Sequence, residues 1–159
     1  MEYERPTHLF FRFEDLRIYN KAIDYVSWVY NNSQFFPDNE KNGIATKFIS
    51  SAQLIAVYIA EGSCRNKAQL IHYLKMAKSV IRECLVMTTI CQKLNFLSDA
   101  SVEESRLFLI EMTKMIGAMV ASLQKFERTY DKKEDYQKEE DPKDEYMHEH
   151  LPLDPLMEL

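Results

Sequence analysis

Glycine and proline are scarce in this chain of 159 residues, which has three glycines and five prolines. A many-stranded protein needs turn-forming residues about every 8–12 positions, so the scarcity excludes a large sheet. Glycines at positions 43, 62 and 117 alone also exclude a glycine-rich nucleotide-binding loop. Long helices joined by short connections are the architecture that remains.

Cysteine is also infrequent, and its spacing fits no disulfide or zinc pattern. Cys64, Cys84 and Cys91 are odd in number and form no C-x-x-C pair. Cys84 and Cys91 share one helical face, which is typical of reduced core residues. The sequence has no leader-like segment and no apolar run of about 18 residues. We therefore expect a cytoplasmic protein that does not contact a membrane.

Residue patterns that support catalysis or metal binding are lacking too. His72 has no partner suggested by the sequence, and the E-x-x-H pairs of di-iron bundles are missing. His148 and His150 are too few to form a metal site by themselves. Glu61, beside Gly62, fits a structural role better than a catalytic one. We expect no enzymatic activity, no metal and no cofactor.

Apolar residues instead recur at helical spacing in four segments. In the first segment, from about residue 13, they are Leu16, Tyr19, Ile23, Val26 and Tyr30, with Ala22 and Val29 beside them. The second segment covers about 40–61, the third about 66–95, and the fourth begins near residue 101. This pattern predicts an all-α, antiparallel up-down-up-down four-helix bundle with an acidic C-terminal tail. We expect residues 1–12 to form an N-terminal arm, 13–131 the bundle, and 132–159 the tail.

Several residues are expected to begin or end these helices. Gly62 is placed to end the second helix in a left-handed conformation. Asn66 is placed to cap the third helix. The fourth helix should begin with a capping box formed by Ser101 and Glu104.

The net charge of −5 is unevenly distributed. Residues 1–130 carry 16 basic and 14 acidic side chains, whereas residues 131–159 carry 4 basic and 11 acidic. The bundle is therefore slightly basic and the tail strongly acidic. The final LPLDPLMEL (151–159) is apolar enough to dock on a protein surface.

The second predicted helix has apolar residues on two faces. Ile44, Phe48, Ala52, Ile55 and Ile59 form the expected core stripe. A second face, which would be exposed in a monomer, suggests a subunit contact; its residues are Lys47, Leu54, Val57, Tyr58 and Glu61. Alternatively, the N-terminal arm or the C-terminal segment covers this face.

The third predicted helix carries positive charge on one side. No acidic residue occurs between Glu61 and Glu83, but five cations do: Arg65, Lys67, Lys75, Lys78 and Arg82. Lys67, Lys75, Lys78 and Arg82 share a face opposite the apolar residues. Such a row favours the binding of phosphates of RNA or DNA. The alternative is an ordinary solvated helix face.

Several motifs resemble one known family. Phe13-Glu-Asp-Leu16-Arg-Ile-Tyr19 resembles its F-x-D-L-x-V-W/Y opening, and Phe36-Pro37 with Glu40 and Gly43 resembles P-x-x-E-x-x-G-L. Ile59-Ala60-Glu61-Gly62 with Arg65 resembles the hallmark N-I-A-E-G-x-x-R, and Ala77 with Glu83 matches A-x-G-S-x-x-E. Residues 13–125 thus resemble the four-helix-bundle proteins encoded by intervening sequences in bacterial 23S ribosomal RNA genes. The sequence departs from the pattern at Lys47, Ser50, Tyr58 and Ser79-Val80.

This resemblance implies a homopentamer of up-down bundles without known catalytic chemistry. It also implies a likeness in fold to the accessory protein of diversity-generating retroelements, a basic pentamer that works with a reverse transcriptase and nucleic acid. Residues and resemblance together predict a non-enzymatic oligomer that binds RNA or DNA through the third helix. The other hypothesis is a protein-interaction adaptor that recruits a partner through its tail and helix surfaces.

Overall fold

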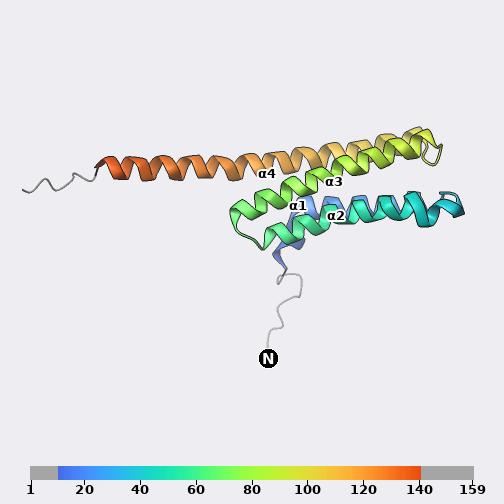
Figure 1. The fold of residues 1–159 in the computed structure, drawn as a ribbon, viewed down its shortest axis with the longest axis horizontal. Coiled ribbons are helices and arrows are strands. Elements are labelled where there is room, and N and C mark those ends of the chain that lie inside the picture. The colour runs from blue at the N-terminus through green and yellow to red at the C-terminus, as the bar shows by residue number, and fades with distance from the viewer. Residues whose placement is uncertain (1–10, 141–159) are drawn as a thin grey trace, which may run out of the picture. The chain divides into compact units, whose positions relative to one another are not determined.

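A computed structural model describes the backbone of residues 11–140 and the side chains of residues 11–125. Its four α-helices are α1 (Arg17–Ser33), α2 (Thr46–Ser63), α3 (Lys67–Lys93) and α4 (Asp99–Glu140), as Figure 1 shows. Short 3₁₀ turns lie at Arg12–Asp15 and Asp38–Glu40, and a π-helical turn lies at Lys41–Ala45. The described residues contain no strand, which confirms the all-α, four-helix prediction.

The contacts between neighbouring helices are those of antiparallel pairs, which an up-down-up-down arrangement requires. In each pair, a later residue of one helix meets an earlier residue of the other. The pairs are Lys47–Glu83 and Tyr58–Tyr73 for α2 and α3, Thr88–Ser105 and Gln92–Asp99 for α3 and α4, and Lys21–Glu111 and Trp28–Glu104 for α1 and α4.

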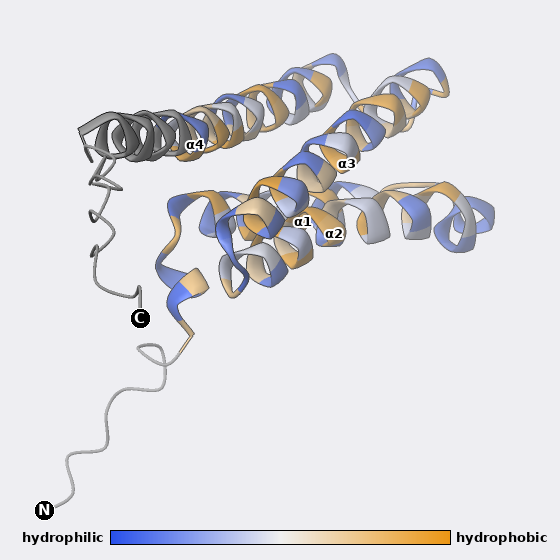
Figure 2. Ribbon diagram, turned by 60° about the vertical axis from the view of Figure 1, so that its left-hand side comes forward, coloured by the Kyte–Doolittle hydropathy of each residue, from blue (hydrophilic) through white to orange (hydrophobic). Residues whose placement is uncertain are grey.

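The core is apolar and is supplied by all four helices. Figure 2 shows hydrophobic and hydrophilic residues alternating along α1, α2 and α3, as amphipathic helices require. The largest apolar side chains that are fully buried are Tyr25, Phe48, Ile18, Ile55, Ile59, Leu74, Met112 and Ile116. The predicted core stripe of α2 is thus confirmed from Phe48 to Ile59, whereas Ile44 is only half-buried.

The buried line of α1 differs from the apolar stripe that is most evident in the sequence. Ile23 and Tyr30 are 40% and 46% exposed. The buried residues are Ile18, Ala22, Tyr25, Val29 and Ser33. This line faces inward because α1 packs against both α2 and α4, and Tyr25 finds a polar partner there.

A chain of hydrogen bonds crosses this core. The hydroxyl groups of Tyr25 and Ser105 share a bond of 2.9 Å, and those of Ser105 and Thr88 share one of 2.7 Å. Thr88 donates to the carbonyl oxygen of Cys84 at 2.9 Å. Because each hydroxyl has one proton, Ser105 donates to Thr88 and Tyr25 donates to Ser105. Burial raises the pKa of Tyr25 well above its usual value, so this donor stays protonated.

Two of the three predicted helix ends are wrong in detail. The prediction for Asn66 is confirmed, because its side chain accepts a bond of 3.0 Å from the backbone N–H of Gln69. The fourth helix, however, begins one turn before the predicted box: Ser98 accepts from the N–H of Ser101 at 3.1 Å. Glu104 lies inside the helix and accepts a bond from Trp28 instead.

Gly62 does not adopt a left-handed conformation, and it lies buried within α2. The one non-glycine residue with positive φ among those described is Asn95, at 57°. Asn95 ends α3 in a Schellman motif, in which the N–H of Phe96 donates to the carbonyl of Cys91 and that of Asn95 to Gln92. Asparagine tolerates this conformation because its short polar side chain can hydrogen-bond locally.

The chain's contacts separate two units, Met1–Gln124 and Lys125–Leu159. The bundle described above lies within the first. Helix α4 continues to Glu140, so residues 132–140 of the predicted tail are helical. Residues 141–159, which include His148, His150 and LPLDPLMEL, and residues 1–10 of the predicted arm lie outside the described part.

By length and composition alone, two described segments would be able to cross a membrane: Asp38–Ser63 and Asp99–Lys125. The core helices of a water-soluble bundle pass the same test. In this structure, the large apolar residues Phe48, Ile55 and Ile59 of the first segment are buried in the core.

Candidate functional site

Helix α3 presents three cations on its outer side. Lys75 and Arg82 are exposed and Lys78 is half-buried. Their spacing of three and four positions places them on one face of α3. We call Lys75, Lys78 and Arg82 the basic ridge.

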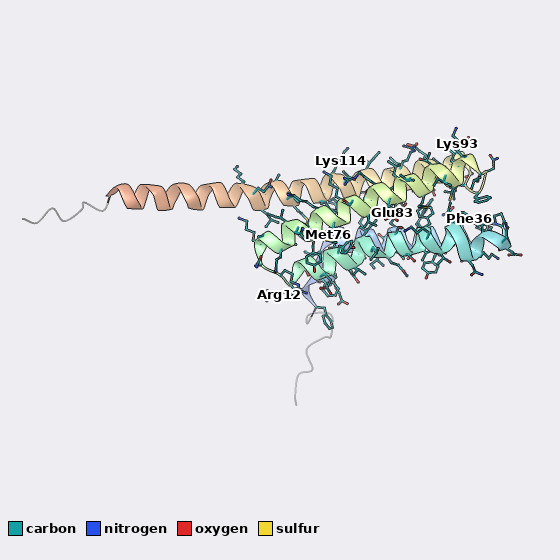
Figure 3. All side chains as sticks on the ribbon, viewed as in Figure 1. Arg12, Phe36, Met76, Glu83, Lys93 and Lys114 are labelled. Carbon is teal, nitrogen blue, oxygen red and sulfur yellow. The ribbon has the colours of Figure 1, made fainter. Side chains whose placement is uncertain are left out.

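Acidic residues near the basic ridge point to other faces of the bundle. The Glu83 carboxylate lies 2.9 Å from Lys47 Nζ of α2, and this hydrogen bond holds the pKa of Glu83 below its usual value. Figure 3 shows Glu83 on the side of α3 that faces α2. On α4, Glu111 pairs with Lys21 of α1 at 2.7 Å and with Arg17 at 3.4 Å. These two carboxylates are thus neutralised away from the ridge, whereas the exposed Glu103 makes no ion pair among the described residues and lies three positions before Arg106 on α4.

Helix α4 adds cations to the basic ridge of α3, and the sequence pattern of α3 alone does not reveal them. Arg106 and Lys114 line a recess of about 270 Å³ between α3 and α4, together with Arg82 of the ridge. Its other lining residues are Ile81, Leu85, Leu109, Ile110 and Thr113, so no lining residue is acidic. Figure 3 shows Lys114 on the edge of α4 away from α2. We call this feature the α3–α4 recess.

A periodic signal for these residues is present in the sequence. Arg106, Ile110 and Lys114 are four positions apart, which places them in one row on a helix. The antiparallel register with α3, which brings this row beside Arg82, depends on packing and is not visible in the sequence.

The cations around the recess are not neutralised within the described part of the chain. Lys75, Lys78, Arg106 and Lys114 make no ion pair there, and Arg82 donates a hydrogen bond of 2.9 Å to the neutral hydroxyl of Ser79. The surface formed by α3 and α4 therefore carries an uncompensated positive charge that attracts polyanions.

Arg65 and Lys67 are also predicted to bind nucleic acid; Arg65 lies in the connection between α2 and α3, and Lys67 is the first residue of α3. Arg65 pairs with Glu61 at 3.1 Å, and this hydrogen bond raises the pKa of Arg65. Its charge is therefore balanced locally. Lys67 is half-buried and lies eight positions before Lys75, about 12 Å along the helix axis.

The five residues of the predicted subunit contact fall into two groups. Leu54 and Val57 are 37% and 47% exposed on the outer face of α2. Lys47, Tyr58 and Glu61 have partners within the chain: Lys47 pairs with Glu83, the ring of Tyr58 lies 6.2 Å from that of Tyr73, and Glu61 pairs with Arg65. Leu54 and Val57 are thus the two residues of the five that make no such ion pair or ring contact among the described residues.

An apolar groove of about 450 Å³ adjoins Val57 between α1 and α2. Its lining combines α1 and the preceding 3₁₀ turn with a side of α2 that shares only Val57 with the predicted subunit contact: Phe13, Tyr19, Ile23, Val26, Gln53, Ala56, Val57 and Ala60. Ile23 of α1 and Val57 of α2, both exposed apolar residues, therefore meet at one groove.

Among the described residues, no three His, Cys, Asp or Glu side chains lie close enough to hold a metal ion. Burial raises the pKa of the Cys84 thiol to about 12 and that of Cys91 to about 11, which keeps both thiols protonated and unreactive.

Comparison with known proteins identifies one matching family. A search of curated proteins finds no match to the chain. The family model of the 23S rRNA-intervening sequence protein matches residues 14–118, which cover α1, α2 and α3 and the first part of α4. The matched span includes Glu61, Gly62, the basic ridge and the α3–α4 recess. The chain therefore belongs to the 23S rRNA-intervening sequence protein family.

Proposed function

We propose that the protein is a non-enzymatic, oligomeric four-helix bundle that binds RNA or DNA through the basic ridge and the neighbouring cations of α4. The observation that carries this proposal is the set of five cations Lys75, Lys78, Arg82, Arg106 and Lys114, none of which is ion-paired among the described residues, beside a recess that no acidic residue lines. A row of cations binds phosphates by releasing condensed counterions, largely regardless of sequence.

Filter binding over a range of salt concentrations tests this function. The variant Lys75→Ala, Lys78→Ala, Arg82→Ala should bind RNA or DNA more weakly. The slope of log affinity against log salt should fall by about 0.7–0.9 for each phosphate that the variant no longer neutralises. Unchanged binding by this variant would overturn the assignment to the ridge.

Assembly into a homo-oligomer, with a pentamer as the expected form, is the second part of the proposal. The exposed Leu54 and Val57 support it, together with the apolar groove between α1 and α2 that Val57 lines, because exposed apolar surface of this kind suits a subunit contact. Light scattering should give a mass of five 18.8 kDa chains. The substitution Val57→Asp should lower that mass, and a wild-type protein that stays monomeric would contradict the proposal.

A second candidate function is that of a protein-interaction adaptor. It rests on the composition of residues 131–159, in which 11 acidic side chains outnumber 4 basic ones. Removal of residues 132–159 should then abolish capture of a protein partner, and nucleic acid should not compete for that partner. Loss of capture only when nucleic acid is added would favour the first function.

A further inference from the structure

The α3–α4 recess has an apolar floor, which the attraction of phosphates alone does not require. The side chains of Ile81, Leu85, Leu109 and Ile110 form it, and Ile110 is 49% exposed. Cations stand on both sides: Arg82 on α3, and Arg106 and Lys114 on α4. A ligand that fits this site combines an apolar surface with regularly placed negative charges.

We infer that the α3–α4 recess binds single-stranded nucleic acid, with bases placed against the apolar floor and phosphates beside the cations. This inference rests on the proposed function and specifies its substrate class. A single strand exposes the faces of its bases, which can pack on apolar side chains or stack on the planes of arginine guanidinium groups. Arg82 and Arg106 provide two such planes at the recess.

A duplex gains little from the same recess. Its base faces are already buried in the stack, so its outer surface presents phosphates, sugars and base edges. A recess of about 270 Å³ can admit a base but not a double helix. Duplex nucleic acid should therefore bind through the cations of α3 and α4 without contacting the apolar floor.

An acidic peptide with apolar side chains is the other ligand whose chemistry resembles that of the recess. The positive charge continues past the recess along α3, from Arg82 to Lys78 and Lys75. A charged row that extends over more than one helical turn beyond the apolar floor matches the regular backbone of a polyanion. It therefore favours nucleic acid over a short peptide.

Two substitutions on α4 separate the effect of the apolar floor from that of charge. Ile110→Ser removes an apolar side chain from the recess, and Leu107→Ser removes one that is 58% exposed and does not line the recess. Fluorescence anisotropy would measure binding of single-stranded dT and rU oligonucleotides and of a DNA duplex at one salt concentration. We expect Ile110→Ser to weaken single-strand binding by about fivefold, because less apolar area is buried against the bases, and to leave duplex binding unchanged. Leu107→Ser should change neither.

The outcomes distinguish this inference from the proposed function. The inference would be overturned if Ile110→Ser weakened single-strand and duplex binding equally, or weakened neither. The proposed function would still stand in that case if the ridge variant Lys75→Ala, Lys78→Ala, Arg82→Ala bound nucleic acid more weakly than the wild type does. No weakening in the ridge variant would overturn the function itself. A synthetic peptide of residues 141–159 is the last probe. If Ile110→Ser abolished binding of this peptide but not of the single strand, the recess would be a peptide site and the inference wrong.

Discussion

Gly62 of α2 lies so close to Tyr73 of α3 that a Cβ atom at position 62 would come within 2.7 Å of the tyrosine Cβ. The same atom would lie 3.2 Å from Leu70 Cδ1. Position 62 therefore requires glycine because two helices approach each other there, although its backbone is helical. This contact fixes the end of α2 against the beginning of α3, directly before the basic ridge.

Replacing Gly62 with alanine should destabilise the bundle. The added methyl group would overlap with a Cβ atom, which cannot move away without a shift of the helix backbone. We expect a loss of about 1–3 kcal/mol in the free energy of unfolding, the usual range for overpacking. Urea unfolding followed by circular dichroism would measure it.

Gly117 of α4 provides the matched control. A Cβ there would meet no atom within 4 Å, so alanine fits without strain. Because alanine is the better helix former, Gly117→Ala should stabilise the protein by about 0.5–1 kcal/mol. Equal effects of the two substitutions would contradict the close approach at Gly62.

The buried hydrogen bonds of Tyr25 and Ser105 predict an asymmetry between two substitutions. Ser105→Ala leaves the buried Tyr25 hydroxyl without its acceptor, which should cost about 1–3 kcal/mol. Tyr25→Phe removes the donor itself and leaves the Ser105–Thr88 bond in place, so it should cost about 1 kcal/mol. A smaller cost for Ser105→Ala, measured by urea unfolding, would contradict this direction of donation.

Thiol reactivity should separate the three cysteines. Cys64 is exposed, whereas Cys84 and Cys91 are fully buried with raised pKa values. In the native protein at neutral pH, a chromogenic disulfide reagent should modify Cys64 rapidly and the other two only as slowly as the bundle unfolds. The variant Cys64→Ser should then show no rapid phase, and persistence of that phase would contradict the burial of Cys84 or Cys91.

Periodicity in the sequence was sufficient to predict the four helices, the core stripe of α2 and the Asn66 cap. These features depend on spacing within one segment, which a single sequence displays directly. Features that depend on two helices were less accessible. The role of Gly62 reflects its distance to Tyr73, and the inward position of Tyr25 reflects the presence of Ser105 on α4.

The candidate site shows the same division. The basic ridge could be read from α3 alone, because a run without acids is visible in the sequence. Arg106 and Lys114 were missed because their proximity to Arg82 depends on the register between α3 and α4. The local pairing of Arg65 with Glu61 likewise becomes visible only with the structure.

The ion pair between Lys47 and Glu83 predicts a dependence of stability on pH. Because the pKa of Glu83 is lowered in the folded state, the unfolded chain binds a proton first as the pH falls. The stabilisation is therefore present above the unfolded pKa of about 4.3 and is lost as the pH falls through the lower folded value. Since both side chains are partly exposed, it should amount to at most about 1 kcal/mol.

Urea unfolding of the wild type and of Glu83→Gln would measure this contribution. The wild type should be the more stable protein at about pH 7, and the difference should shrink as the pH falls below the unfolded pKa of about 4.3. Lys47→Ala should show the same loss at neutral pH. A difference that stayed constant with pH would exclude the ion pair as its cause.

The binding of nucleic acid by the positive surface of α3 and α4 is tested most directly by its dependence on salt concentration. The measurement compares Arg82→Gln, Lys114→Gln with Arg17→Gln, Lys41→Gln. Both double variants lose the same net charge, but Arg17 and Lys41 are paired with Glu111 and Asp38. For a single strand, the slope of log affinity against log salt should fall by about 0.7 for each cation removed from the recess, and it should not change in the control. Equal changes in the two variants would show that net charge, and not this surface, determines binding.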